Sequence, residues 1–172
     1  MTKIDHDRLF KELLTRHFEA FVEGFYPEIH DELDFSGFGA ENFLSQEQIS
    51  ELGGKLHRLD VIAKVKIKND PKKDAFLIVF VEAQHKRNKE FLARVFRYFA
   101  LLHIKHGVTI IPMVIYSDKA KWKSEEAWTE YNMGFAGHEF LKFKFLAVKP
   151  SMLSIKEYLR SNNPAQIALA SL

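Results

Sequence analysis

An almost unbroken apolar run constrains the fold of this chain more than any other feature of its sequence. Residues 75–81 read Ala-Phe-Leu-Ile-Val-Phe-Val, and Glu82 follows directly. Apolar runs rich in β-branched and aromatic side chains are typical of a strand that is buried on both faces of a sheet. The sequence therefore predicts a central strand here.

The segment before this run predicts a second strand, because residues 56–67 alternate between apolar and polar side chains. The apolar positions are Leu59, Val61, Ala63, Val65 and Ile67. Residues 69–74 carry turn-forming side chains, so the two strands should form a hairpin. If the hairpin is symmetric about Pro71, paired residue numbers sum to 142, and Asp60 faces Glu82.

Helical periodicity appears on both sides of this hairpin. Residues 7–22 and 88–105 place apolar side chains at three- and four-residue intervals, which predicts two amphipathic helices. Gly107 follows the second helix, as is typical of a helix end. The segment 24–54 mixes Pro, Gly, Ser and acidic residues with aromatics and predicts an irregular connection.

Two further strands are expected, at residues 108–116 and 141–148. Pro112 lies in the first of them and has no backbone N–H to donate. We therefore expect an edge position or a bulge there. Strands and helices together predict an α/β fold.

The composition fits one domain, since 47% of the 172 residues are hydrophobic. No Cys is present, which excludes disulfides and thiolate zinc sites. No apolar run approaches the roughly 20 residues that cross a bilayer. We therefore expect no membrane partner and a cytoplasmic location. The absence of GxxxxGK[ST], GxGxxG and GxSxG patterns argues against a phosphate loop or an acyl hydrolase.

Charge is distributed unevenly along the chain. Residues 1–54 hold 12 Asp and Glu against 4 Lys and Arg, whereas residues 55–172 hold 11 against 21. The net charge therefore changes from −8 to +10 between the two parts. A basic second part suits a phosphate-binding surface, although such patches also serve solubility alone.

Asp60 and Glu82 are the candidate metal ligands. Directly opposed residues of a hairpin have Cβ atoms roughly 5 Å apart, so two carboxylates there can hold one cation. Glu82 ends an apolar run, where an unpaired carboxylate is costly to desolvate, and Mg²⁺ would compensate it through oxygen ligands. Alternatively, Asp60 pairs with Arg58 or Lys64, and Glu82 pairs with Lys86 or emerges at the end of the sheet.

Gln84 lies two residues after Glu82, so the strand period turns it toward the same face. Its amide can orient an attacking water or bond to a phosphate oxygen, but it cannot supply the positive charge of a Lys. The alternative is an ordinary side chain at a strand end.

The order of these residues resembles the PD-(D/E)xK nuclease core: Asp60, a hairpin, residues 82–84 and a helix bearing Arg94 and Tyr98, with Gln in place of the Lys. Within that superfamily, the segments DHDRLFKELL, LDVIAKVKI, FVEAQ and RVFRYFALLH resemble the recombination-promoting nuclease/putative transposase family of bacterial proteins. The likeness covers residues 7–118. It implies a restriction-endonuclease-like core, in which helices flank a central mixed sheet made of the hairpin and further strands.

The resemblance also implies a site and a mechanism. Asp60, Glu82 and the main-chain carbonyl of Ala83 would hold one or two Mg²⁺ ions beside the scissile phosphate, with Mn²⁺ as an alternative metal. The metal would lower the pKa of a bound water, and Gln84 would position that water. The implied partner is DNA. The sequence does not show whether the chain forms a homodimer.

The resemblance divides the chain into a nuclease-like core, residues 1–150, and the start of a C-terminal helical region, residues 151–172. The short apolar helix expected after Pro164 either docks onto the core or belongs to a region that continues in a longer protein. We favour the second interpretation, because family members usually continue with further helices.

Six side chains near the motif are candidates for nucleic-acid binding: Lys64, Lys66, Lys86, Arg87, Arg94 and Tyr98. The four flanking cations could follow a phosphate backbone, and solubility explains them nearly as well. Arg94 and Tyr98 are one helical turn apart, but Glu90 and Arg94 also have the spacing of an ordinary helix ion pair. Asp7 and Glu12 are accessory candidates, with helix capping or solvation as the alternative.

Two functions remain in play. The first is a metal-dependent DNA endonuclease that hydrolyses phosphodiester bonds in recombination or transposition. The second is a catalytically inactive module that keeps the nuclease fold for binding nucleic acid or protein, since Gln84 stands where the catalytic Lys is expected.

Overall fold

The central apolar run forms the middle strand of a five-stranded sheet. The computed structural model describes residues 6–44, 61–82, 89–117, 129–152 and 154–170. In chain order the elements are α1 (His6–Arg16), α2 (Phe18–Phe25), α3 (Pro27–His30), β1 (Leu33–Asp34), η1 (Ala40–Asn42), β2 (Val61–Ile67), β3 (Asp70–Glu82), α5 (Lys89–His106), β4 (Thr109–Tyr116), β5 (Glu130–Phe135), β6 (His138–Lys144), β7 (Leu146–Val148), η2 (Pro150–Met152), α7 (Ile155–Arg160) and α8 (Pro164–Ala170).

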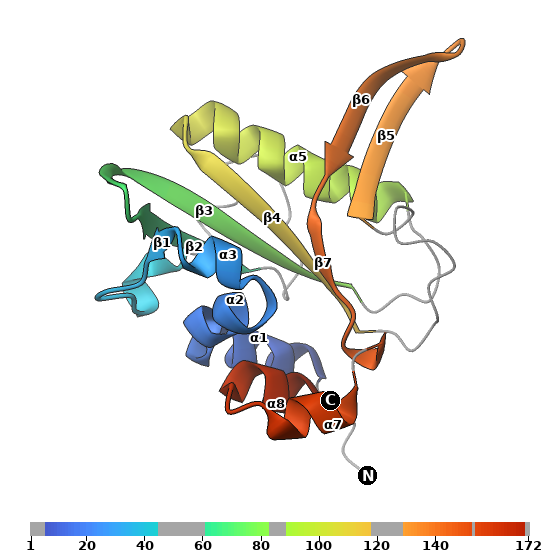
Figure 1. Cartoon of the computed structure of the whole chain (residues 1–172). Coiled ribbons are helices and arrows are strands. Elements are labelled where there is room, and N and C mark those ends of the chain that lie inside the picture. Colours follow the sequence, from blue (N-terminus) through green and yellow to red (C-terminus); the bar gives the residue numbers. More distant parts are fainter. Residues whose placement is uncertain (1–5, 45–60, 83–88, 118–128, 153, 171–172) are drawn as a thin grey trace.

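The sheet has the strand order β1-β2-β3-β4-β7. Strands β1, β2 and β3 pair antiparallel, whereas β3, β4 and β7 run parallel. Helix α5 covers one face of the sheet, and the N- and C-terminal helices gather on the other (Figure 1). The structure thus confirms the predicted α/β fold with a mixed sheet flanked by helices.

The hairpin of β2 and β3 forms as predicted, but its register differs by two residues. Val61 pairs with Val79 and Lys64 with Phe76, so paired numbers sum to 140 rather than 142. The turn lies at residues 68–69, before the expected centre at Pro71, and a bulge after Lys66 brings Ile67 opposite Asp70. The prediction of a turn centred on Pro71 was therefore wrong.

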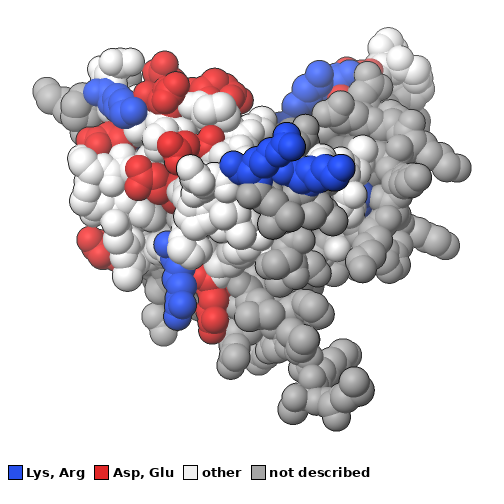
Figure 2. All heavy atoms as spheres, turned by 60° about the horizontal axis from the view of Figure 1, so that its bottom comes forward, with Lys and Arg blue, Asp and Glu red and all other residues white. Residues whose placement is uncertain are grey.

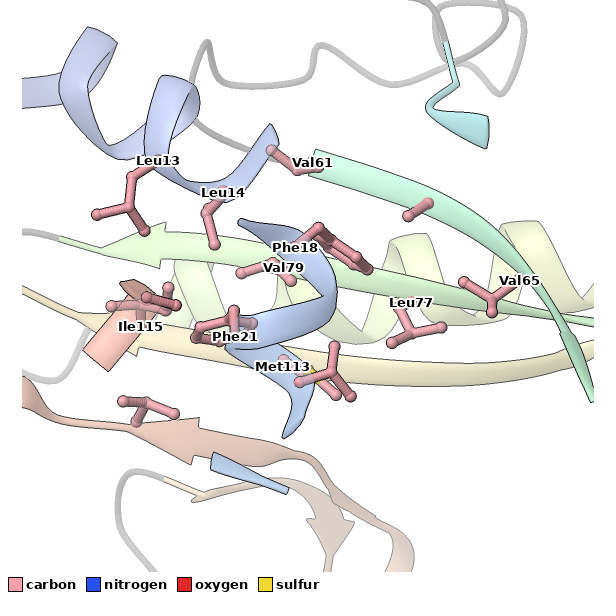
Figure 3. Packing of buried hydrophobic residues seen from close by; sticks show 14 of the residues in the cluster. Leu13, Leu14, Phe18, Phe21, Val61, Val65, Leu77, Val79, Met113 and Ile115 are labelled. Atoms are coloured by element: carbon pink, nitrogen blue, oxygen red, sulfur yellow. The ribbon is translucent and has the colours of Figure 1, made fainter. Parts of the chain in front are cut away.

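Two apolar clusters, one on each face, bury the sheet. The first joins α1, α2 and α8 to β2, β3, β4 and β7, and Figure 3 shows its side chains converging from helices and strands. The second joins α5 and β6 to the opposite face. Residues 75–79 are all buried, which confirms a strand covered on both faces. Val61, Ala63 and Val65 share the first cluster, as their alternation predicts, while Ile62 lies in the second.

The predicted helix at residues 7–22 is interrupted. His17 leaves helical geometry with φ −126° and ψ 33°, so α1 ends at Arg16 and α2 begins at Phe18. The apolar stripe nevertheless continues across the break, since Leu14 and Phe21 are both fully buried. An unbroken stripe therefore hid a bend in the backbone.

The second predicted helix is confirmed as α5, Lys89–His106. Gly107 follows it with φ +62°, the left-handed geometry that a residue without Cβ adopts most easily. Its N–H donates to the carbonyl of His103 at 2.8 Å, which satisfies a carbonyl in the last turn.

Strand β4 lies between β3 and β7, so the strand with Pro112 is not an edge strand over its whole length, and no bulge interrupts its pairing with β3. The short strand β7 pairs only with Met113, Val114 and Ile115. Pro112 therefore lies just beyond the end of that ladder, where its missing N–H interrupts none of these pairs.

Two parts of the chain contain more structure than the sequence predicted. The connection after Gly24 includes α3, the short edge strand β1 and η1. Strands β5 and β6 form a separate two-stranded sheet that projects from the body of the molecule at the upper right of Figure 1. Only the end of β6 and β7 fall within the expected strand at 141–148.

Helix α8 packs onto the N-terminal helices, and the expected continuation of this helical region stays a prediction. Ala165 and Leu169 are buried in the first cluster. Asn163 anchors the start of α8, since its side-chain amide donates to the carbonyl of Ala20 at 2.7 Å. Within the described ranges, no helix is both long and apolar enough to span a bilayer.

Candidate functional site

One end of the sheet brings together the ends of three parallel strands and the start of an antiparallel one. Strand β3 ends at Glu82, which is paired with Tyr116, the last residue of β4. Strand β7 ends at Val148, paired with Ile115. Strand β2 begins at this same end with Val61, opposite Val79. The carboxyl ends of parallel strands are where α/β sheets usually carry their binding sites.

The first turns of α5 cover this end of the sheet. The ring of Phe91 meets that of Tyr116 edge to face, with 6.1 Å between centroids. Arg94 lies one turn further along, half-buried, with its guanidinium carbon 5.1 Å from the centroid of Phe91. An aromatic layer therefore separates the helix from the strand ends and holds a cation beside them.

Lys149 is a buried cation at the same end of the sheet. It directly follows β7 and is only 4% exposed. It follows Val148, which pairs with Ile115, the residue before Tyr116 at the end of β4. The sequence carries a signal for it, because Lys149 ends an apolar strand just as Glu82 does. Lys149 was nevertheless not among the predicted site residues.

At the opposite end of the hairpin, the lysine side chains form ion pairs within the hairpin itself. The Nζ atoms of Lys64 and Lys66 form ion pairs with the two oxygens of Asp74 at 2.9 and 2.8 Å. Burial alone would raise the pKa of Asp74, but the hydrogen bonds and charges of the two lysines outweigh it and hold that pKa below its usual value. Both lysines were predicted to bind nucleic acid. In the structure they neutralise Asp74 across the hairpin, and their role in nucleic-acid binding stays a prediction.

Acidic side chains gather in the N-terminal elements. Residues 6–44 hold 9 Asp and Glu against 3 Lys and Arg, whereas residues 89–117 and 129–152 together hold 3 against 7. Figure 2 shows Asp and Glu side chains clustered on the face that carries the N-terminal helices. The charge asymmetry of the sequence thus becomes a difference between separate elements of the fold.

A family comparison identifies the chain. The sequence model of the family described as "Putative transposase, YhgA-like" matches residues 4–162. The chain belongs to this family. The YhgA-like family is of the PD-(D/E)xK-like recombination-promoting nuclease/putative transposase type, so the resemblance seen in the sequence is confirmed. Membership indicates a role related to transposition and an interaction with DNA. No curated protein and no solved structure gives a significant match.

Most of the motif that this YhgA-like chain shares with PD-(D/E)xK nucleases lies outside the described residues. This holds for Asp60, Ala83, Gln84, Lys86 and Arg87. Glu82 is placed in the backbone as the last residue of β3. The apposition of Asp60 and Glu82 therefore stays a prediction, now with a register that differs from the one we expected.

The remaining candidates lie on two helices. Tyr98 is 2% exposed and belongs to the cluster between α5 and the sheet, and its contact with nucleic acid stays a prediction. Arg94, one turn before it, stays closer to the sheet end described above. Asp7 and Glu12 both lie on α1, and Glu12 is exposed. Their accessory roles stay predictions.

The predicted metal site has the donor chemistry of an oxygen-ligand site. Among the residues that the structure describes, no group of three or more His, Asp or Glu side chains could hold a metal ion. The predicted donors are two carboxylates and one backbone carbonyl, and Mg²⁺ prefers such oxygen ligands. The donor set therefore fits this metal.

Proposed function

We propose that this protein is a metal-dependent DNA endonuclease whose site lies at the end of the sheet where β3, β4 and β7 terminate. The observation that carries the proposal is the position of Glu82. It is the last residue of the central strand, opposite Tyr116, at the sheet end where β2 begins directly after Asp60. Membership of a nuclease/putative transposase family supports this function.

In this proposal Asp60, Glu82 and the carbonyl oxygen of Ala83 would hold the metal. When bound, Mg²⁺ or Mn²⁺ would lower the pKa of a coordinated water and neutralise charge on the leaving oxygen. The chain supplies geometry: β3 pairs with β2 as far as Val79 and with β4 as far as Glu82, which positions the end of the strand. The amide of Gln84 would orient the attacking water by hydrogen bonding.

Lys149 would supply the positive charge that Gln84 lacks. Neighbouring strands lie about 4.8 Å apart, so Lys149 is about two strand spacings from Glu82. A lysine side chain can extend over much of that distance toward a phosphate held between them. Lys149 would thus stabilise the negative charge that grows on the phosphate during hydrolysis.

The test is a plasmid cleavage assay with Mg²⁺ and Mn²⁺ titrated into the wild-type protein, Asp60→Asn and Lys149→Gln. The proposal predicts nicking that requires metal, is lost in Asp60→Asn and falls strongly in Lys149→Gln. Circular dichroism of each variant would confirm that it is folded. Cleavage that persists in Asp60→Asn would contradict the proposed site.

A second function is favoured by one residue, Gln84, which stands where nucleases of this superfamily carry Lys. The chain would then be an inactive nuclease-fold module that binds nucleic acid or protein. DNA binding that is sensitive to salt but indifferent to Mg²⁺ and to Asp60→Asn would favour this module. Metal-dependent cleavage would exclude it.

A further inference from the structure

The ribbon formed by β5 and β6 presents large apolar side chains to solvent at its far end. Phe135 is 79% exposed and Phe140 is 70% exposed, and Met133 adds a third at 47%. The base of the same ribbon is different, since Phe143 is only 7% exposed. The exposed rings contribute little to the core, so the stability of the fold does not explain them.

The base of the ribbon is rigidly attached to α5. Phe96 meets the rings of Tyr131 and Phe143, with centroids 5.8 and 5.3 Å apart, and Phe99 meets Phe143 at 4.9 Å. An isolated two-stranded ribbon is marginally stable in water, and this aromatic anchor fixes its direction. The tip therefore stands away from the body at a defined position (Figure 1).

The backbone of the turn determines where the ring of Phe135 lies. Phe135 pairs with His138 across a two-residue turn in which Ala136 and Gly137 have φ of +50° and +82°. Positive φ at both positions is the hairpin turn that matches the twist of the flanking strands. The turn thus places Phe135 at the very end of the ribbon.

Phe140 owes its position to a bulge. Met133 pairs with Leu141 and Gly134 with Glu139, so Phe140 has no residue opposite it. A Cβ at Gly134 would lie 2.5 Å from the carbonyl oxygen of His138, and only glycine allows this close approach. Bulges redirect side chains and also interrupt regular edges, which disfavours strand pairing with a second copy.

Two exposed cations follow Phe140 on β6. Lys142 and Lys144 are both exposed and two residues apart, hence about 7 Å apart along the strand. Glu130, the acid across from them, is buried and is bound by Asn132 at 3.0 Å and by Lys142 at 3.5 Å. The asparagine and the two lysines lower the pKa of Glu130. The surface of this strand therefore carries the exposed ring of Phe140 followed by the two lysines.

We propose that the β5–β6 ribbon is a DNA-binding arm, in which Phe135 and Phe140 stack on unpaired or unstacked bases and Lys142 and Lys144 contact the adjoining phosphates. Proteins that bind single-stranded nucleic acid without sequence specificity stack bases on exposed aromatic rings and contact the backbone with cations. The inference rests on the proposed action on DNA, which family membership supports. The arm would contact DNA at a place away from the proposed cleavage site at the strand ends.

The test is fluorescence anisotropy with a labelled single-stranded 20-mer and the matching duplex, in EDTA so that nothing is cut. Phe135→Ala and Phe140→Ala should each weaken single-strand binding roughly tenfold. Phe140→Trp should restore it, whereas Phe140→Leu should not, because leucine keeps the bulk without the ring. Ile104→Ala is the matched control, since Ile104 is 80% exposed on α5, and it should leave binding unchanged.

Two further readouts make the outcome decisive. A 2-aminopurine base in the strand should lose fluorescence on binding wild type, through stacking, and keep it with the double Phe→Ala variant. Equal affinity of wild type and double variant, or no DNA binding by wild type, would overturn the proposal. So would loss of self-association in the double variant with DNA affinity intact, as that would make the tip an interface between copies. Because binding is measured without metal, these results test the DNA-binding arm even if the protein does not cleave DNA.

Discussion

The charged side chains at the two ends of the β2–β3 hairpin have different surroundings. At the turn end, the carboxylate of Asp74 is held by Lys64 and Lys66 at 2.9 and 2.8 Å, so three charges satisfy one another. At the other end, Glu82 closes β3 among strand ends that also carry the buried Lys149. Lys64 and Lys66 thus stabilise the hairpin through Asp74, whereas Glu82 and Lys149 are the groups that we propose act on the metal and the phosphate.

The largest expected contrast concerns cleavage. Glu82→Gln removes a proposed metal ligand and should lower the rate of metal-dependent plasmid nicking by about 100-fold or more, since even residues that only orient metal ligands cost roughly 10- to 100-fold. Asp74→Asn, at the turn end, should leave the rate within about twofold once corrected for folded protein. Equal losses in both variants would erase the distinction between the two ends.

Stability should show the reverse pattern. Asp74→Asn should lower the free energy of unfolding by about 1–2 kcal/mol at pH 7, because charged hydrogen bonds are removed from a carboxylate that is 17% exposed, while the half-exposed lysines reduce the effect. Urea denaturation measures it, with the exposed Asp31→Asn as control.

The same difference should vanish in acid. The pKa of Asp74 is lowered on folding, so its contribution is fully present above its unfolded value and is lost as the pH falls through the lower folded value. Wild type and Asp74→Asn should therefore converge in stability well below about pH 4. A gap of unchanged size at low pH would contradict the ion-pair explanation.

A smaller effect is expected on DNA affinity, where the lysines of the hairpin should matter less than those of the β5–β6 ribbon. Lys64→Gln with Lys66→Gln should change affinity less than about twofold, because both lysines are bound to Asp74 at 2.9 and 2.8 Å, closer than the 3.5 Å between Lys142 and Glu130. Lys142→Gln with Lys144→Gln should weaken binding and reduce the salt dependence by about one unit of slope for each phosphate that is no longer neutralised. Anisotropy titrations at several salt concentrations distinguish the two pairs.

The smallest effect on the free energy of unfolding is expected at the hydroxyl of Tyr158, which, unlike the carboxylate of Asp74, has no hydrogen bond to a described residue. The hydroxyl of Tyr158 is buried without a hydrogen bond to any described residue, and burial raises its pKa to about 12. Tyr158→Phe should therefore leave the free energy of unfolding within about 0.5 kcal/mol of wild type, or raise it slightly. A loss above about 1 kcal/mol in thermal or urea unfolding would show that the hydroxyl is satisfied.

The fold was predictable where one physical signal dominated. The apolar run before Glu82 suited a strand covered on both faces, and the segment of α5 carried an apolar stripe with a glycine directly after it. The break at His17 was hidden because the apolar stripe continues across it. The hairpin register was missed because a bulge after Lys66, invisible in the composition, moved the turn ahead of Pro71.

The candidate site was predictable only in its backbone frame. The sequence indicated that Glu82 ends a strand, and the pairing with Tyr116 places it at the end of two parallel strands. Spacing could not reveal that Lys64 and Lys66 share Asp74, since their ion pairs form across the hairpin. Tyr98 looked like half of a phosphate-binding pair, yet the same helical period turns it into the core.

Metal binding by Glu82 is the central claim, and isothermal titration calorimetry of Mn²⁺ tests it most directly. Wild-type protein, Glu82→Gln and the control Glu28→Gln, an exposed acid on α3, would be compared after circular dichroism confirms that each is folded. We predict that wild type and Glu28→Gln bind Mn²⁺ with the same affinity and that Glu82→Gln does not bind it. Equal binding by all three proteins would contradict the proposed metal site.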